Sequence, residues 1–104
     1  MRNIEAIVHV PGIDAVLIGP YDLSASLGKL GHVDHPDVIH AIDQVTKVCR
    51  ETGFRLGIFG VSAEAVQPYI AQGYTVIVAG VDTLLLGQAA SALLTQLKIQ
   101  REPR

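Results

Sequence analysis

Apolar residues follow two patterns along the chain: short unbroken runs, and longer stripes with intervals of three and four. Three runs are rich in aliphatic and aromatic side chains and end in glycine, at 15–19, 54–60 and 74–80. Such runs are typical of strands that are buried on both faces of a parallel sheet. We therefore predict three strands, each of which leads at its carboxyl end into a loop.

Four helices are predicted between and around these strands, because apolar residues recur there three or four positions apart. Their ranges are 2–9, 36–52, 63–72 and 84–98. Pro36 and Gly53 delimit the second helix, at positions that these residue types favour. Strands that alternate with helix-sized connections require a parallel sheet with right-handed crossovers. The sequence therefore predicts an α/β fold, with the strands adjacent in chain order and the loops 19–24, 60–62 and 80–83 at one end.

The last predicted helix carries an apolar stripe that we expect to face inward. The stripe consists of Leu86, Ala89, Ala90, Leu93, Leu94 and Leu97. Asp82 or Thr83 is expected to cap this helix, which is a simpler role for Asp82 than a hydrogen bond near a site. A sheet of three strands leaves two apolar edges unpaired, so we expect that the isolated chain is not a stable monomer.

The stretch at 19–24, Gly-Pro-Tyr-Asp-Leu-Ser, is the most informative for function because it follows the first predicted strand. Gly19 allows a ligand to approach the backbone closely. The amides of Tyr21 and Asp22 could hold an anion in one concavity, while the Asp22 carboxylate holds a divalent cation. A plainer alternative is that Asp22 or Ser24 only caps a short helix. The residues alone leave both interpretations open.

Composition and charge narrow the range of functions. The net charge is −2 and basic residues form no cluster, so nucleic acid is not an expected partner. Cys49 is the single cysteine, which excludes an internal disulfide and a cysteine-based zinc site; we expect a buried thiol. Apolar runs fall short of the roughly 20 residues that cross a bilayer, and residues 1–5 lack the apolar core of a signal peptide. We expect a cytoplasmic protein without a membrane partner.

Four motifs together match a known pattern. They are Val10-Pro-Gly-Ile-Asp14, the Gly-Pro-x-Asp-Leu-Ser loop, His35-Pro36 and Val78-Ala-Gly-Val-Asp-Thr83. Over residues 3–97 the chain resembles the HpcH/HpaI aldolase family of class II 2-oxo acid aldolases. The resemblance implies a TIM (β/α)8 barrel of the phosphoenolpyruvate/pyruvate-binding type. Residues 1–104 would then be a partial barrel domain that lacks the N-terminal strands and contains about strands six to eight.

The same resemblance implies an activity, a cofactor and an assembly. The family consists of lyases that cleave 4-hydroxy-2-oxo acids to pyruvate and an aldehyde, and it forms homo-oligomers, as hexamers, that exchange their last helix. Asp22 would be one of two carboxylates that hold Mg²⁺, Mn²⁺ or Co²⁺. Gly19, Pro20, Tyr21 and Asp22 would bind the 2-oxo acid, with the amides of Tyr21 and Asp22 on the pyruvate carboxylate. Many members have alanine where Tyr21 stands, so the shape of the pocket is expected to differ.

Other residues that the family needs have no counterpart in this chain: a glutamate of a Gln-x-Glu motif, a catalytic histidine and a substrate-binding arginine. We therefore assign no catalytic residue and expect the isolated chain to be incomplete as a catalyst. Glu5, His9, His32, His35 and His40 are expected to be surface or capping residues rather than substitutes.

Two further functions remain open. One is a non-catalytic remnant or interaction module that docks to a homologous barrel. The other is a small open-sheet binding domain in which Asp22 holds a cation, as in receiver-like proteins, although the clustered acids of such proteins are missing.

Overall fold

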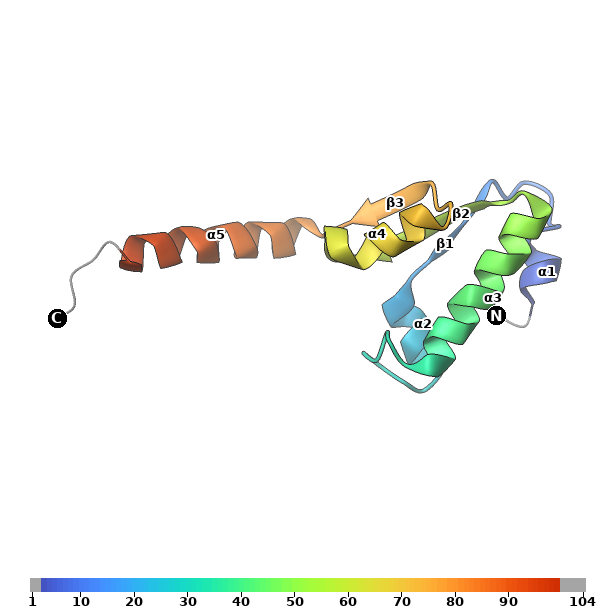
Figure 1. The fold of residues 1–104 in the computed structure, drawn as a ribbon, viewed down its shortest axis with the longest axis horizontal. Helices are drawn as coiled ribbons and strands as arrows, with labels where there is room; N and C mark the ends of the chain where they lie inside the picture. Colours follow the sequence, from blue (N-terminus) through green and yellow to red (C-terminus); the bar gives the residue numbers. More distant parts are fainter. Residues whose placement is uncertain (1–2, 100–104) are drawn as a thin grey trace.

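The computed structural model describes residues 3–99 and is elongated, with principal extents of 65 × 27 × 22 Å. Figure 1 shows a body that contains the sheet, and a last helix that projects away from it. The elements in chain order are α1 (Ile4–Ile7), β1 (Ala15–Ile18), α2 (Pro20–Ser26), α3 (Pro36–Thr52), β2 (Arg55–Gly60), α4 (Ala63–Ala71), β3 (Val76–Ala79) and α5 (Asp82–Ile99).

The sheet is parallel throughout, with the strand order β1-β2-β3. This confirms the predicted α/β fold and the predicted adjacency of the strands. β2 and β3 begin later than predicted because Phe54 and Tyr74 still complete the ends of the preceding helices. The amide of Phe54 donates to the carbonyl of Cys49 at 2.7 Å, and the amide of Tyr74 donates to that of Tyr69 at 3.1 Å.

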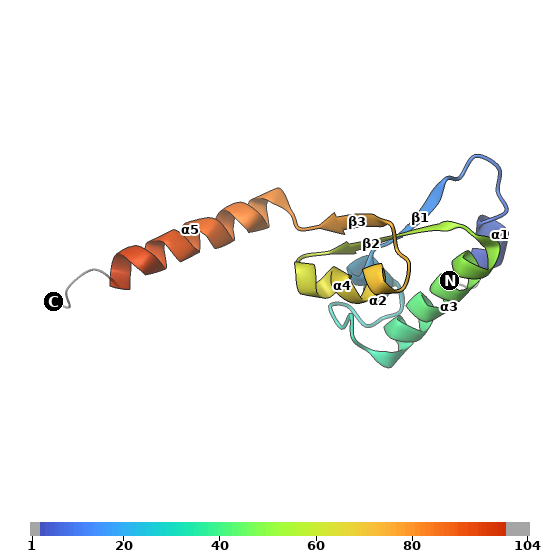
Figure 2. The ribbon, with the colours of Figure 1, turned by 45° about the horizontal axis from the view of Figure 1, so that its top comes forward.

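Helices cover one face of the sheet and leave the other open. Figure 2 shows α3 and α4 on the same side of the strands. On this side Ile18, Leu56 and Ile58 are at most 3% exposed and belong to the main hydrophobic core. Leu17, one position away in β1, is 54% exposed, and Val78 in β3 is 39% exposed. The prediction that the strands are buried on both faces therefore holds for one face only in residues 3–99.

The last helix, α5, lies outside the core. Its side chains from Asp82 to Lys98 are all exposed, and Leu86 is 73% exposed. The radius of gyration is 18.2 Å, whereas a compact domain of this length has about 13 Å. The prediction of an inward-facing stripe is therefore wrong within the described chain, because no described element reaches that stripe.

The capping predictions had mixed outcomes. The amide of Leu85 donates to the carbonyl of Val81 at 2.9 Å, so α5 begins at Asp82 and neither Asp82 nor Thr83 is its cap. The side chain of Ser62 does cap α4, as an acceptor for the amide of Ala65. α1 ends before the predicted helix 2–9 does; Arg2, at the start of that prediction, lies outside the described residues. Among the described residues, no helix is long and apolar enough to cross a membrane.

A buried polar pair joins α3 to the segment between α4 and β3. The Tyr74 hydroxyl lies 2.6 Å from Thr46 Oγ1, and both residues are buried. Thr46 has a single hydroxyl hydrogen, which it donates to the carbonyl of Ile42 at 2.8 Å. Tyr74 must therefore be the donor in the pair. Its ring also packs edge-on against Tyr69, with centroids 5.2 Å apart. Cys49 is fully buried in the same core, as predicted.

Candidate active site

The loop after β1 turns directly into the short helix α2. Gly19 is its N-cap residue, with φ −103° and ψ 98°, and Pro20 is its first residue. Proline favours this position because its φ angle already suits a helix and it has no N–H to satisfy. Asp22 therefore lies in the first turn and Ser24 in the middle of α2. The alternative that either residue caps the helix is wrong, although the short helix itself is present.

This start of α2 leaves two backbone donors free of helical partners. Leu23 is the first residue whose amide donates to a carbonyl in this turn, that of Gly19 at 2.9 Å. Pro20 has no N–H, so the unpaired amides of the first turn belong to Tyr21 and Asp22. They are the two amides that the sequence analysis assigned to an anionic substrate group. The positive end of a helix favours an anion at this position.

The Asp22 carboxylate lies next to Gly19. Its Oδ2 atom is 3.4 Å from the position that a Cβ on Gly19 would take. A Cβ at position 19 would therefore be in van der Waals contact with the carboxylate. Asp22 makes no hydrogen bond or ion pair with another described side chain. Its oxygens thus remain available, and they are of the type that Mg²⁺ and Mn²⁺ prefer.

The Ser24 side chain is buried and makes hydrogen bonds to the backbone on both sides of it. It is fully buried, its Oγ donates to the carbonyl of Tyr21 at 2.6 Å, and it accepts from the amide of Gly31 at 3.2 Å. This hydroxyl therefore ties the first turn of α2 to the segment that follows the helix.

A hollow of about 410 Å³ lies beside Asp22, and we call it the front hollow. Its lining consists of Leu17, Gly19, Tyr21, Asp22 and Phe59. The sequence analysis missed Leu17 and Phe59. The signal that could have found them is the alternation of side chains along each strand. Leu17 pairs with Gly57, and Phe59 is two residues after Gly57, so Leu17 and Phe59 lie on the same face of the sheet.

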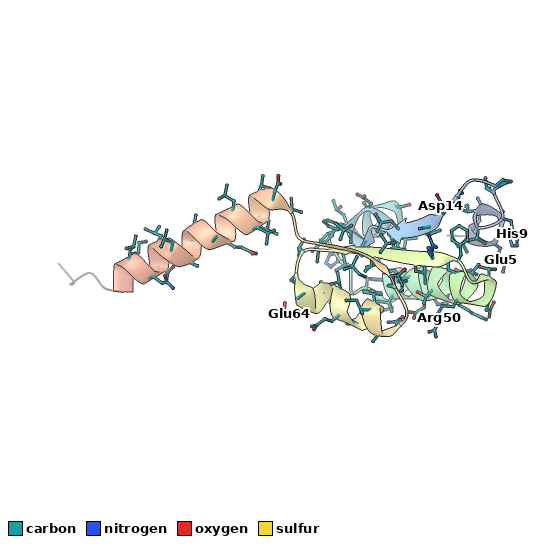
Figure 3. All side chains as sticks on the ribbon, turned by 90° about the horizontal axis from the view of Figure 1, so that it is seen from above. Glu5, His9, Asp14, Arg50 and Glu64 are labelled. Carbon is teal, nitrogen blue, oxygen red and sulfur yellow. The ribbon has the colours of Figure 1, made fainter. Side chains whose placement is uncertain are left out.

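Other candidate residues lie elsewhere. Figure 3 shows Glu5 and His9 near Asp14, the residue before β1, and so at the opposite end of this strand from Asp22. His9 Nδ1 donates to the carbonyl of Glu5 at 2.6 Å. His35 caps α3, because its Nδ1 accepts from the amide of Asp37, the second residue of that helix, at 3.1 Å. These placements agree with surface and capping roles.

Asp82 follows β3, and β2 lies between β3 and β1. Its carboxylate accepts from the amide of Thr83 at 2.7 Å. Within residues 3–99, no three histidine, cysteine or acidic side chains are close enough to hold a metal ion together. Of the described acidic residues, Asp22 is thus the one that lies beside free amides and a hollow at the carboxyl end of a strand.

Two curated aldolases are similar to this chain in sequence. The chain is 42% identical over 93 residues to 4-hydroxy-2-oxo-heptane-1,7-dioate aldolase of Escherichia coli, a match that covers 89% of this chain and 36% of the relative. It is 36% identical over 103 residues to 2-dehydro-3,6-dideoxy-6-sulfogluconate aldolase of Pseudomonas putida, covering 99% of this chain and 40% of that protein. The chain thus spans well under half the length of these relatives.

A solved structure with a similar fold belongs to the same kind of protein. The crystal structure of an HpcH/HpaI aldolase/citrate lyase family protein from Burkholderia cenocepacia superposes with a TM-score of 0.89 and 35% sequence identity, covering 93% of this chain and 38% of that one. The family model of HpcH/HpaI aldolase/citrate lyase matches residues 1–89. The chain therefore belongs to the HpcH/HpaI aldolase/citrate lyase family.

Proposed function

We propose that this chain is part of a divalent-metal-dependent aldolase that cleaves 4-hydroxy-2-oxo acids to pyruvate and an aldehyde. In this proposal residues 1–104 contribute about strands six to eight of a (β/α)8 barrel. The observation that supports it most is the position of Asp22, which stands beside two free amides at the carboxyl end of a parallel strand in a member of an aldolase family.

Each residue of the loop has a role in the proposed reaction. The amides of Tyr21 and Asp22 bind the carboxylate of the 2-oxo acid, and Pro20 fixes the start of the helix that presents them. Gly19 lies next to the Asp22 carboxylate, which holds the cation together with a second carboxylate outside this chain. When bound, the cation supplies Lewis-acid stabilisation of the negative charge that develops on the pyruvate half. The bond between C3 and C4 breaks, the C4 hydroxyl loses its proton, and C3 gains one.

The test uses a chimeric aldolase in which residues 3–97 replace the matching part of the Escherichia coli relative. In it, Asp22→Asn keeps the size and hydrogen-bonding shape of the side chain but removes its charge. We expect both the Mn²⁺ affinity and the cleavage rate of 4-hydroxy-2-oxopentanoate to fall by more than about 100-fold, since residues that merely orient metal ligands are worth 10- to 100-fold. Mn²⁺ binding is measured by electron paramagnetic resonance, and pyruvate release by a coupled assay.

Asp14→Asn is the matched control, because it makes the same change of charge in the residue before β1, at the other end of the strand. It is expected to leave Mn²⁺ affinity and cleavage rate as they are. Normal metal affinity and turnover in the Asp22→Asn chimera would show that the ligand assignment is wrong.

A second candidate function, docking to a homologous barrel without catalysis, is favoured by the exposed surface. The accessible surface is 7595 Å², whereas a folded monomer of 11.1 kDa exposes about 5,700 Å². The excess of about 1,900 Å² on one chain is more than the roughly 800 Å² that each partner buries in a standard protein–protein interface, and it matches the larger interfaces of permanent complexes. We expect the isolated chain to associate in sedimentation experiments; a compact monomer with a cooperative thermal transition would exclude this expectation.

A further inference from the structure

A second hollow lies at the same end of the sheet as Asp22, among α2, α3, α4 and the end of β2. We call it the side hollow; its volume is about 420 Å³. Apolar side chains, including Ile39, Ile42 and Val61, make up much of its lining. Because it opens where the strands end, it adjoins the region in which α/β proteins bind their ligands.

Two aromatic residues are common to the linings of the side hollow and the front hollow. Of the described residues, Tyr21 and Phe59 alone line both. Tyr21 is 46% exposed, so its ring is not part of the buried core, and its hydroxyl makes no hydrogen bond with a described side chain. The ring is therefore free to act as a wall between the two hollows without a packing role in the core.

We propose that Tyr21 and Phe59 set the length of the substrate by closing the front hollow toward the side hollow. This inference rests on the proposed function. It concerns the half of the 4-hydroxy-2-oxo acid that leaves as the aldehyde, and it assigns to this chain a preference for short aldehydes. Removal of the wall joins the side hollow to the front hollow and admits longer substrates.

The residues that line the side hollow also predict how the charge at the end of a long substrate affects its cleavage. Two acidic residues, Asp34 and Asp43, are among the residues that line it, together with Tyr69. Asp43 lies close enough to Tyr69 to add to the effect of burial, which raises the pKa of the Tyr69 hydroxyl. A substrate that extends into the side hollow thus meets negative charge and a neutral hydroxyl. Long substrates with an uncharged end should gain more from an opened wall than those that end in a carboxylate.

The experiment measures kcat/KM of the chimeric aldolase for three substrates. They are 4-hydroxy-2-oxopentanoate, 4-hydroxy-2-oxoheptanoate, and 4-hydroxy-2-oxo-heptane-1,7-dioate, which differs from the second by a carboxylate in place of a methyl group. Tyr21→Ala keeps the backbone amide and removes the ring. We expect it to raise the heptanoate-to-pentanoate ratio about tenfold or more, the range that a few methylene groups in a pocket provide. Tyr21→Phe keeps the ring and should leave the ratio unchanged.

The dioate supplies the second readout. In the Tyr21→Ala chimera the heptanoate should gain about fivefold more than the dioate, the effect of one unit charge a few ångströms from another in water. Asp43→Asn added to Tyr21→Ala should remove that difference. If Tyr21→Ala fails to fold, Phe59→Leu tests the same wall. A chimera that cleaves the pentanoate but whose length ratio changes with neither substitution overturns this inference alone, whereas one that folds and cleaves none of the three overturns the proposed function.

Discussion

The hydroxyl pair between α3 and the segment before β3 predicts an unequal response to two conservative substitutions. Tyr74 donates to Thr46 Oγ1, and Thr46 donates to the carbonyl of Ile42. Tyr74→Phe removes one hydrogen bond and leaves the Thr46 hydroxyl bonded to Ile42. It should lower the free energy of unfolding by the net contribution of a single hydrogen bond, about 0.5–1.5 kcal/mol.

Thr46→Val should cost more, although valine has nearly the same shape as threonine. It leaves the Tyr74 hydroxyl without an acceptor in a place where this residue is only 2% exposed. A buried donor without a partner costs about 1–3 kcal/mol. The double variant Thr46→Val/Tyr74→Phe contains no orphaned donor, so it should be no less stable than Thr46→Val alone. The two substitutions are therefore coupled by about 1 kcal/mol or more.

The assay is urea unfolding of the unsubstituted chain, the two single variants and the double variant, monitored by far-ultraviolet circular dichroism. All four are measured at one protein concentration, because association would change the apparent stability. The slope of the free energy against urea should be the same for all four. Additive costs in the double variant, or a larger cost for Tyr74→Phe than for Thr46→Val, would refute the assignment of Tyr74 as the donor.

Two further predictions concern stability. Gly60→Ala would put a Cβ 2.6 Å from Val66 Cγ1, so it should lower the free energy of unfolding by about 1–3 kcal/mol. At Gly87 a Cβ would have no atom within 4 Å, so Gly87→Ala should leave the free energy of unfolding unchanged or raise it by up to about 1 kcal/mol. The urea midpoints of the two variants test both expectations. Burial raises the pKa of the Cys49 thiol above 9.0 and that of the Tyr69 hydroxyl above 10.0, so the unfolded chain loses these protons first. These two groups should therefore lower the stability of the folded chain as the pH rises above about 9; midpoints that do not fall in this range would contradict the prediction.

Much of the fold follows from local patterns in the sequence. Continuous apolar runs between helical stripes require a parallel sheet, and the Gly19-Pro20 pair marks where the first strand must end. The faces of the strands could not be separated in the same way. Leu17 and Ile18 are equally apolar, yet one is 54% and the other 3% exposed. The difference arises from the helices that cover one side, and that is a property of the assembled structure.

In the candidate site, too, local features could be predicted from the sequence, whereas features that depend on the assembled structure could not. Asp22 and the amides beside it could be predicted because they lie within one short segment. For Phe59, alternation along β2 indicates only the face of the strand, because its place in the front hollow also depends on the pairing of β1 with β2 across a long stretch of chain. The exposure of α5 was also beyond prediction. Its apolar residues recur at intervals of three and four as in α3, but they spread around more of the helix, so the pattern marks no single face for burial.

The buried Ser24 hydroxyl has a consequence for motion. Because one oxygen bonds both the Tyr21 carbonyl and the Gly31 amide, the segment after α2 cannot swing away while the first turn stays in place. The two parts should open as one unit, with the Gly31 amide exchanging its hydrogen at the rate set by opening of α2 rather than at the rate of a free loop. A ligand on the Tyr21 and Asp22 amides would then slow exchange at Gly31, several residues away from any atom that it touches.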